Sequence, residues 1–350
     1  MKENLIYIAP NKSTFIKKDI LFLEEIFNVK TQDLSWGNAL KLPWNLILQL
    51  FFLLQNIKTS KVIVISFGGY FSLLPVIIGK IFKVKTLMIL NGTESVSFPE
   101  YNYGSLRKKT LKFFIKYSLI NVTEILPVDA SLIKQTHTFD KEITIKKQGY
   151  KSFFPNINTP FKIVPNGFDT EFWRVENSIK SGFITVAAIS NRSILKLKGI
   201  DLFIEMAKMH PNENFTIVGV SDFLREEISI YKNIDVFPFM EKEKLKDLYA
   251  KHQFYVQLSL NEGFGCSLAE AMLSECIPII SNTGALPNVV NDSGFVVKNR
   301  IITEVNNVFE EAIKLTEVEK TKLSIKARKR IVENFPISNR EQLLLQEIEA

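Results

Sequence analysis

Cysteine is scarce in this sequence, which contains only Cys266 and Cys276. Two cysteines cannot supply the disulfide framework that holds many small secreted domains together, so a hydrophobic core must hold this fold, as suits a reducing compartment. Histidine is scarce as well, and His137, His210 and His252 are scattered along the chain. We interpret these three as surface or core residues rather than as metal ligands.

The sequence also lacks a clear membrane-spanning segment. The apolar run Leu42–Ile57 is short, and Val62–Phe82, although about as long as the roughly 20 residues that a span needs, is divided by Gly68-Gly69 and Pro75. The N-terminus runs directly into a short apolar strand without the pattern of a signal peptide. We therefore expect a cytoplasmic protein.

The net charge is +7, which fits an anionic substrate, an anionic membrane surface or nucleic acid as a partner. No zinc-finger spacing, RNA-binding aromatic motif or clustered basic tail accompanies this charge. We therefore expect no nucleic-acid partner.

Short apolar runs alternate with longer amphipathic segments from end to end, which is typical of a parallel α/β protein. A chain of 350 residues favours two domains, and the segment Pro155–Pro165, rich in Pro, Asn and Thr, is the predicted hinge. The predicted fold is two doubly wound Rossmann-like domains that face an interdomain cleft, with ligands beyond the carboxyl ends of the strands.

The periodicity assigns strands and helices to both halves. The expected strands are Leu5–Ile8, Val62–Ile65, Thr86–Leu90, Glu124–Pro127, Phe183–Ile189, Asn214–Val218, Asp235–Pro238, Phe254–Leu258 and Pro278–Ser281. The expected helices are Thr14–Ile26, Trp44–Gln55, Leu106–Leu119, Ile200–Met209, Lys242–Lys251, Ser267–Ser274, Glu304–Leu315 and a charged final segment, Glu317–Ala350, broken near Pro336.

The segment Asn261–Met272 carries the most chemical information, because it follows an expected strand and opens a helix. Gly263 and Gly265 allow the backbone to approach a ligand closely, and the free N–H groups at a helix start favour a phosphate. Glu270 lies one turn into the helix, where it can accept hydrogen bonds from a ribose, and Glu262 would face the next part of the ligand. The alternative is a glycine-rich turn with two surface carboxylates.

Two glutamates eight residues apart around Gly-Phe-Gly resemble the donor-binding motif of family 4 retaining glycosyltransferases, a group 1 type of glycosyl transferase with the GT-B fold. The stretch Cys276–Ser281 followed by Gly284, and Val164–Asp169 at the hinge, are similar to that family too. The resemblance implies a catalytic Glu262 near the donor sugar and Glu270 on the ribose. It places the backbone of the following residues along the diphosphate: Gly263, Phe264, Gly265, Cys266, Ser267 and Leu268.

The resemblance also implies a domain arrangement. Residues 1–162 would bind the acceptor, residues 163–334 would bind the nucleotide sugar, and the last helix, 335–350, would pack back on the first domain. No cofactor is implied beyond the nucleotide sugar as substrate. No Asp-x-Asp motif occurs either, which argues against the metal-dependent transferases of the other common fold.

A basic site precedes the glycine-rich segment. Lys198 stands before Gly199 at the start of an expected helix, and the family has an arginine and a lysine here against the donor phosphates. We assign Lys198 and Arg192 to these roles, although Arg192 lies one residue further from Lys198 than expected. The chemical need is for fixed cations, because a departing nucleoside diphosphate develops negative charge. The alternative for Lys198 is a solvated surface charge.

The first domain departs from the family at Asn91. Many members have a histidine here that contacts the donor sugar, and Glu94 stands where an aspartate is common. Asparagine can hold a sugar hydroxyl but cannot transfer a proton at neutral pH. Because the leaving phosphate itself can accept the acceptor's proton in retaining transfer, we keep Asn91 as a catalytic-site residue. The alternative is a plain turn after a buried strand.

Acceptor recognition is less defined in the sequence. Gly68-Gly69 follows the second expected strand at the cleft edge, where an acceptor would approach, and Glu94 is assigned to the same side; a plain turn is the alternative. Lys17 and Lys18 follow the first strand and are interpreted as a solvated helix start. The helix Leu106–Leu119 has its lysines on one face and Phe113, Phe114 and Tyr117 towards the other. This pattern fits either contact with anionic lipid or a core helix with a solvated basic face.

The resemblance thus implies an enzyme that moves a sugar from a nucleotide-sugar donor to a glycan or lipid-linked acceptor in cell-surface polysaccharide synthesis, with retention and without a metal. The alternative is a catalytically silent subunit that binds a nucleotide sugar or glycan and supports an active partner. A nicotinamide-dependent enzyme is a third interpretation, which the absence of G-x-G-x-x-G after the first strand disfavours.

Overall fold

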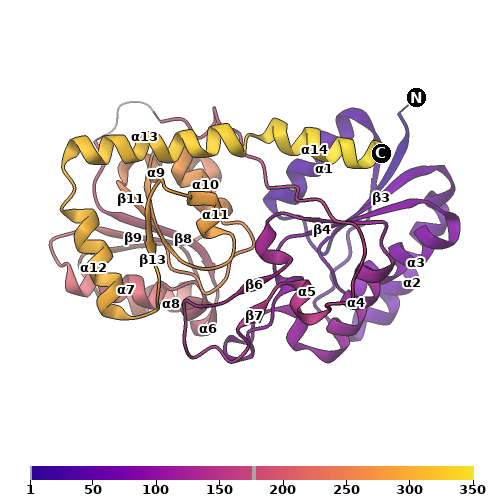
Figure 1. Cartoon of the computed structure of the whole chain (residues 1–350), viewed down its shortest axis with the longest axis horizontal. Helices are drawn as coiled ribbons and strands as arrows, with labels where there is room; N and C mark the ends of the chain where they lie inside the picture. Colours follow the sequence, from indigo (N-terminus) through magenta and orange to yellow (C-terminus); the bar gives the residue numbers. More distant parts are fainter. Residues whose placement is uncertain (1, 176–178) are drawn as a thin grey trace.

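The computed structural model describes residues 2–175 and 179–350 and consists of two α/β lobes joined side by side (Figure 1). Each lobe is built on a parallel sheet, with strand order β2-β1-β3-β4-β5 in the first and β10-β9-β8-β11-β12-β13 in the second. In both sheets the chain first adds strands on one side of the starting strand and then crosses to add the rest on the other side, as in doubly wound folds. The predicted fold class is therefore confirmed.

The N-terminal lobe contains the first five-stranded sheet and the helices around it. Its strands are β1 (Asn4–Ile8), β2 (Asn28–Thr31), β3 (Ser60–Ser66), β4 (Lys85–Leu90) and β5 (Glu124–Pro127). Its helices are α1 (Thr14–Ile26), α2 (Leu42–Asn56), α3 (Leu73–Phe82), α4 (Lys109–Asn121) and the short α5 (Tyr150–Phe153). A small hairpin, β6 (Gln135–Thr136) and β7 (Lys147–Gln148), extends from this lobe.

The C-terminal lobe contains the six-stranded sheet. Its strands are β8 (Phe183–Ile189), β9 (Phe215–Val220), β10 (Ile234–Phe237), β11 (Phe254–Gln257), β12 (Ile277–Ser281) and β13 (Phe295–Val297). Its helices are α6 (Arg192–Leu197), α7 (Ile200–Met209), α8 (Asp222–Ile228), α9 (Lys242–Lys251), α10 (Cys266–Leu273), α11 (Leu286–Val290), α12 (Ile302–Ile313) and α13 (Glu317–Asn334).

The strands form where the sequence has continuous apolar runs, because parallel strands covered by helices on both faces are buried throughout. In β3, for example, the central run from Val62 to Ile65 is entirely β-branched and buried, and Lys61 is the exposed residue of the strand. The predicted helix Leu106–Leu119 starts later than expected. Residues Ser105–Arg107 form a 3-10 turn instead, and Lys108 is extended (φ −91°, ψ 116°), so α4 begins at Lys109.

The last helix, α14 (Ile337–Glu349), crosses back from the C-terminal lobe to the N-terminal lobe, and α13 and α14 run along one edge of the molecule (Figure 1). Arg340 of α14 forms a buried ion pair with Asp19 of α1, with Nη2 and Oδ2 2.6 Å apart. The guanidinium also donates to the backbone oxygens of Val164 and Pro165. The final helix therefore joins α1 to the segment that connects the lobes.

A second connection comes from the hairpin. Phe139, in the loop between β6 and β7, is fully buried within the hydrophobic core of the C-terminal lobe. The backbone N–H of Arg300 donates to the Phe139 oxygen at 2.7 Å, and its guanidinium lies 2.5 Å from Asp201 and 3.7 Å from Asp140. The N-terminal lobe thus inserts one aromatic side chain into its neighbour.

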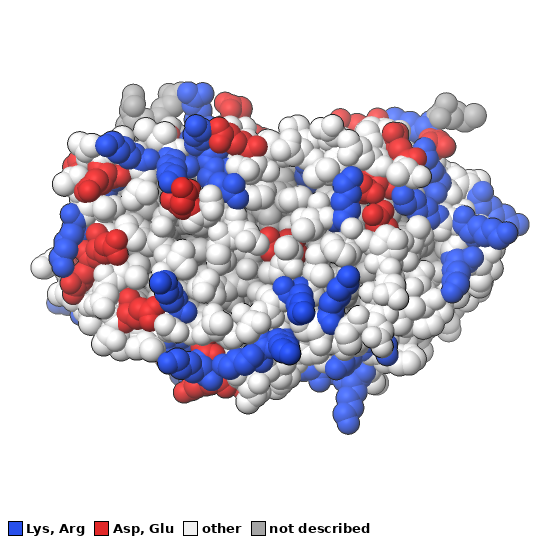
Figure 2. All heavy atoms as spheres, viewed as in Figure 1, with Lys and Arg blue, Asp and Glu red and all other residues white. Residues whose placement is uncertain are grey.

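Charge is unevenly distributed over the surface. In Figure 2, Lys and Arg side chains stand out over α2, α3 and α4, whereas Asp and Glu are visible mainly over the C-terminal lobe and along the upper edge. Within residues 2–175 and 179–350, no helix combines the length and the apolar character needed to cross a membrane.

Candidate active site

The carboxyl ends of the central strands of both sheets point toward the junction between the lobes, where doubly wound folds bind ligands. From the N-terminal lobe come the loops after β1, β3 and β4, and from the C-terminal lobe come those after β8, β11 and β12. The glycine-rich segment predicted to bind the donor connects β11 to α10. This junction is therefore the place to test each predicted site residue.

Lys198 and Glu262 meet at the C-terminal side of this junction. The Lys198 ammonium donates to Glu262 Oε1 at 2.7 Å, and the Ser259 hydroxyl donates to the same oxygen at 2.8 Å. Burial acts to lower the pKa of Lys198, but the Glu262 carboxylate beside it outweighs burial and holds that pKa above its usual value. The lysine therefore stays charged in a site where only about a quarter of its side chain is exposed.

The glycines of the motif serve close approaches between backbones. A Cβ on Gly263 would lie 1.9 Å from the Asn91 backbone oxygen of the opposite lobe, so the two predicted catalytic loops touch at a position that only glycine fits. Gly284 (φ +56°) lies directly under the Glu262 backbone, where a Cβ would be 2.2 Å from the Glu262 oxygen. The neighbouring Ala285 N–H donates to that oxygen at 3.1 Å, which fixes the orientation of the Glu262 loop.

The helix α10 begins at Cys266, after Gly265 in the left-handed conformation (φ +93°). The N–H groups of its first turn, at Cys266, Ser267 and Leu268, have no acceptor within the helix and carry its positive dipole end. Burial raises the pKa of the Cys266 thiol to about 12, so the thiol is neutral and Cys266 is no nucleophile at neutral pH. Its contribution to ligand binding is through the backbone.

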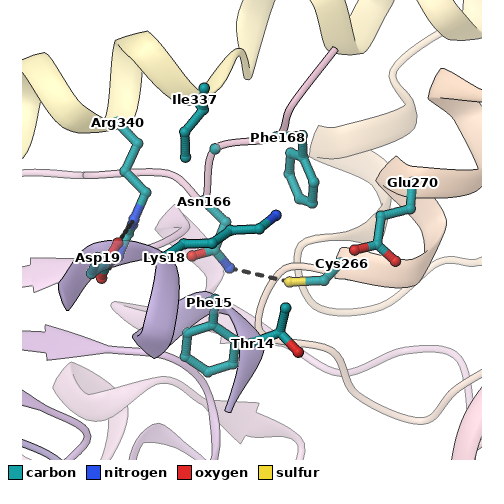
Figure 3. Close-up of a pocket in the computed structure, with 11 residues that line it drawn as sticks. Thr14, Phe15, Lys18, Asp19, Asn166, Phe168, Cys266, Glu270, Ile337 and Arg340 are labelled. Carbon is teal, nitrogen blue, oxygen red and sulfur yellow. Dashed lines mark hydrogen bonds and ion pairs between the residues drawn. The ribbon is translucent and has the colours of Figure 1, made fainter. Parts of the chain in front are cut away.

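Glu270 faces a narrow pocket between the lobes with a cavity volume of about 40 Å³ (Figure 3). The residues that line it come from α1, the interlobe segment, α10 and α14: Thr14, Phe15, Lys18, Asp19, Asn166, Gly167, Phe168, Cys266, Glu270, Ile337 and Arg340. Burial raises the pKa of Glu270 to about 7, and the charge of Lys18 acts in the opposite direction. A carboxyl of this kind changes its charge close to physiological pH.

Asn91 and Glu94 form the opposite rim, after β4. The Asn91 side-chain amide donates to the Ser66 hydroxyl at 3.1 Å, while its Oδ1 is buried without a hydrogen-bond partner within the described residues. The Asn91 backbone N–H donates to Glu94 Oε1 at 2.5 Å. Glu94 is fully buried, and burial raises its pKa to about 7. Glu94 therefore shapes the Asn91 turn, and the Asn91 Oδ1 is a buried acceptor that no described group uses.

The two glycines assigned to the acceptor side are packed into this same rim. Gly68 lies where a Cβ would be 3.4 Å from the Glu94 Cβ, and Gly69 begins a 3-10 turn whose Ser72 hydroxyl donates to the Gly69 oxygen at 2.8 Å. Gly68 and Glu94 are thus brought together. Gly69 has a structural role in its turn.

Arg192 does not join the site in this structure. Its guanidinium lies 3.0 Å from Glu227 on the surface of the C-terminal lobe, and 70% of its side chain is exposed. It begins α6, whose last residue precedes Lys198, and the helical turns between them carry the two side chains apart. The predicted pairing of Arg192 and Lys198 on one ligand is therefore absent from this arrangement.

Lys18 at this junction is misassigned from the sequence alone, which gives no site role to Asn166 or Tyr103. Lys18 is half-buried and extends into the pocket, with Nζ 5.8 Å from the centre of the Phe168 ring (Figure 3), so its assignment as a solvated lysine is wrong. Asn166 donates to the Cys266 sulfur at 3.5 Å. Tyr103 lies near the Lys198 and Glu262 charges, and burial raises its pKa to about 12. The Val164–Asp169 motif was the available signal for Asn166 and Phe168.

Comparisons with known proteins agree with this geometry. Residues 169–336 match the family model "Glycosyl transferases group 1". The chain is 20% identical over 227 residues to a phosphatidylinositol N-acetylglucosaminyltransferase component of Arabidopsis thaliana, a match that covers 61% of this chain and 47% of the relative. It is 31% identical over 102 residues to glycogen synthase of Aquifex aeolicus, covering 27% of this chain and 22% of that protein. The chain therefore spans less than half the length of these curated relatives.

Solved structures share the whole architecture. HepE of Anabaena, determined in complex with UDP and glucose, superposes with a TM-score of 0.73 at 14% identity, and the match covers 100% of both chains. Sucrose-phosphate synthase of Thermosynechococcus elongatus gives a TM-score of 0.76 at 13% identity, covering 99% of this chain and 98% of that one. The chain has the GT-B fold of glycosyltransferases, and its match to the group 1 family model covers most of the C-terminal lobe.

Proposed function

We propose that this chain transfers a sugar from a nucleotide-sugar donor to a glycan or lipid-linked acceptor, with retention of configuration and without a metal ion. One observation carries the proposal. Lys198 and Glu262 form a part-buried ion pair in the C-terminal lobe, and the start of α10 and Glu270, in the same lobe, border the interlobe pocket. A fixed cation, a helix N-terminus and two carboxylates are what a sugar diphosphate and its ribose require.

Each group has a part in the proposed reaction. The N–H groups at the start of α10 hold the diphosphate, and Lys198 neutralises the negative charge that grows on it as the bond to the sugar breaks. Glu262 lies beside Lys198 and accepts hydrogen bonds from the sugar. Glu270 accepts hydrogen bonds from the ribose in the pocket of Figure 3.

The N-terminal lobe supplies the acceptor side in this proposal. Asn91 meets the donor loop at Gly263, and its buried, unpartnered Oδ1 accepts a hydrogen bond from a hydroxyl of the sugar once the two loops move apart. Asparagine does not take a proton at neutral pH, so the leaving phosphate accepts the proton of the attacking hydroxyl. We propose the cytoplasm as the location and cell-surface polysaccharide synthesis as the process, with contact to an anionic membrane where the acceptor is lipid-linked.

The second candidate function is a silent subunit that binds a nucleotide sugar or glycan and supports an active partner. Asn91 favours it, because the asparagine at this position cannot act as a general base. The ion pair between Lys198 and Glu262 fits the enzyme and also a subunit that binds a nucleotide sugar, since both hold a donor.

A donor panel separates the two. The purified chain is heated with UDP-, GDP-, ADP- and CMP-sugars, because a ligand that binds only the folded state raises the midpoint of unfolding. The stabilising donor is then incubated with lipid-linked and glycan acceptors in buffer with EDTA. Transfer in EDTA supports the proposed enzyme. Binding without transfer to any acceptor supports the silent subunit, and stabilisation by none of the donors contradicts the enzyme and any subunit that binds a nucleotide sugar.

A further inference from the structure

Helix α2 buries two amide side chains among its inward residues and exposes large apolar side chains on its outer face. Asn45 and Gln49 are 5% and 1% exposed, and their amides donate to the Ser35 oxygen at 2.8 Å and the Phe71 oxygen at 3.0 Å. In contrast, Trp44 and Phe51 are 61% and 62% exposed. A helix that only covers a sheet buries its apolar side, so the outward side of α2 needs another explanation.

The exposed apolar residues of α2 form one stripe. Trp44, Ile47, Phe51 and Leu54 are spaced by three and four residues, which places them on one face of the helix. Single exposed apolar side chains are ordinary, but a continuous stripe marks an interaction surface.

The neighbouring helices extend this surface. Helix α3 packs against both α2 and α4. The C-terminal end of α3 exposes Ile81 and Phe82, and α4 exposes Phe113 and Ile120. Phe113 is 64% exposed and belongs to the same face of α4 as Lys109 and Lys116, so the predicted separation of basic and aromatic faces on this helix is wrong. We call α2, the C-terminal end of α3 and α4 the docking face.

The docking face carries charge of one sign. No Asp or Glu occurs from residue 34 to 93 or from 101 to 123. The same segments contain exposed lysines: Lys41, Lys58, Lys80, Lys83, Lys108, Lys109 and Lys116. Across the described ranges 2–175 and 179–350, none of these lysines forms an ion pair with a carboxylate. The face therefore presents apolar side chains between unpaired cations.

This combination selects the partner. A second copy of the chain in a symmetric dimer would bring lysines against lysines, because a two-fold interface pairs the same patch with itself. An anionic lipid bilayer matches both features, since aromatic and aliphatic side chains enter the boundary between headgroups and acyl chains while lysines contact the headgroups.

We propose that the docking face binds anionic lipid bilayers, with Trp44 and Phe51 inserted and the lysines that flank α2 (Lys41 and Lys58) and those of α4 on the lipid headgroups. Vesicle binding is measured directly, so this proposal can be tested whether or not the chain transfers sugar. It explains why α2 keeps Asn45 and Gln49 toward the protein and its aromatic residues toward solvent.

The test is flotation of the intact chain with vesicles of phosphatidylcholine alone and of phosphatidylcholine with phosphatidylglycerol. We expect binding to the anionic vesicles, a blue shift of Trp44 fluorescence and a decrease in binding with salt. Trp44 is suited to this measurement because it is the most exposed of the three tryptophans: Trp173 is 3% exposed and Trp36 is only partly exposed. Binding that is equal on neutral and anionic vesicles, or no binding, overturns the proposal.

Paired variants separate the two contributions. The double variant Trp44→Ser, Phe51→Ser should bind anionic vesicles at least about tenfold more weakly, because it removes the inserted side chains. Its control is Phe223→Ser, Phe239→Ser, which removes side chains that are 73% and 76% exposed on the other lobe and should bind like the parent chain.

The charge variant Lys109→Glu, Lys116→Glu should lower binding to the level of neutral vesicles, whereas Lys232→Glu, Lys244→Glu on the C-terminal lobe should not. All these side chains are exposed, so an unchanged unfolding midpoint shows that each variant is folded. Light scattering measures whether the chain forms a dimer through this face. A dimer that Trp44→Ser, Phe51→Ser dissociates would assign the face to a second copy and overturn the lipid proposal.

Discussion

Lys198 and Glu262 lie 64 residues apart in the sequence and form a part-buried ion pair, with Nζ and Oε1 2.7 Å apart. The sequence assigned them to different parts of one ligand, the diphosphate and the sugar. In the structure each neutralises the other, so a bound donor must exchange part of this pairing for its own contacts. Lys198 is thus held charged and in place before the donor arrives.

The first prediction is that Lys198→Ala lowers turnover by roughly 10²- to 10³-fold, because a cation beside developing charge stabilises the transition state more than the ground state. Steady-state kinetics with the donor that stabilises the fold measures it. Lys196→Ala removes an exposed lysine two residues earlier and should leave turnover unchanged. Parent-like turnover in Lys198→Ala would show that Lys198 has no catalytic role and is only a surface charge.

The second prediction concerns pH and Glu270. Burial raises the pKa of this carboxyl to about 7, above its ordinary 4.5, so it is mostly protonated at pH 6 and mostly ionised at pH 8. The ionised form is the stronger acceptor for ribose hydroxyls, and donor affinity should rise by up to about tenfold between these pH values. Calorimetry with a nucleotide sugar measures this change, because its diphosphodiester does not titrate in that range.

Glu270→Gln should remove this pH dependence, and Glu270→Ala should weaken binding by about 1.5–3 kcal/mol, the usual loss for a hydrogen bond to a charged group. Glu94→Gln is the matched control, since burial also raises the pKa of Glu94 to about 7 but this residue lies on the other rim. A pH profile that vanishes in Glu94→Gln and persists in Glu270→Gln would reverse the assignment.

The third prediction concerns Asn91. Asn91→Ala removes the unpartnered Oδ1 and the hydrogen bond to Ser66, and transfer should fall about fivefold, as for the loss of one neutral hydrogen bond of about 1 kcal/mol. Asn91→His should retain or improve transfer, because imidazole offers similar donor and acceptor atoms. Transfer rates of both variants decide, and full transfer in Asn91→Ala would remove this residue from the site.

The fourth prediction tests the contact between the lobes. In Gly263→Ala the new Cβ would lie 1.9 Å from the Asn91 backbone oxygen, so the two loops must separate, at a cost of about 1–3 kcal/mol for overpacking. We expect a lower unfolding midpoint or a more open molecule in small-angle scattering, together with reduced transfer. Gly37→Ala is the control, because nothing lies within 4 Å of its Cβ position. Equal behaviour of the two variants would show that the lobes do not meet at Gly263 in solution.

The fifth prediction concerns the final helix. Arg340→Leu leaves Asp19 buried without its cation, which should lower the free energy of unfolding by about 3–5 kcal/mol. Asp19→Asn in the same chain should restore part of the loss, since the uncompensated charge is then gone. Arg174→Leu breaks an exposed pair with Glu171 and should change stability little. Denaturant titration distinguishes these cases, and an unaffected Arg340→Leu would mean that α14 is not held by this pair.

The amino-acid pattern determined the elements and the local motif. Helices α1, α7 and α9 and strand β8 have the predicted bounds, because their apolar spacing and their flanking residues are local properties. The same holds for the glycine-rich turn before α10, where Gly265 must adopt a positive φ. Short elements such as β2 and β13 were missed, because four or three residues carry too little periodicity.

Only the tertiary structure decided which side chains meet. In the structure Arg192 pairs with Glu227, Lys18 lines the Glu270 pocket, and the Asn91 backbone oxygen lies against Gly263. The tertiary structure also turned the apolar stripe of α2 outward, although the composition of that helix predicts burial. The reason is the same in each case: a local pattern fixes the backbone, whereas the direction and burial of a side chain depend on neighbours that are distant in the sequence.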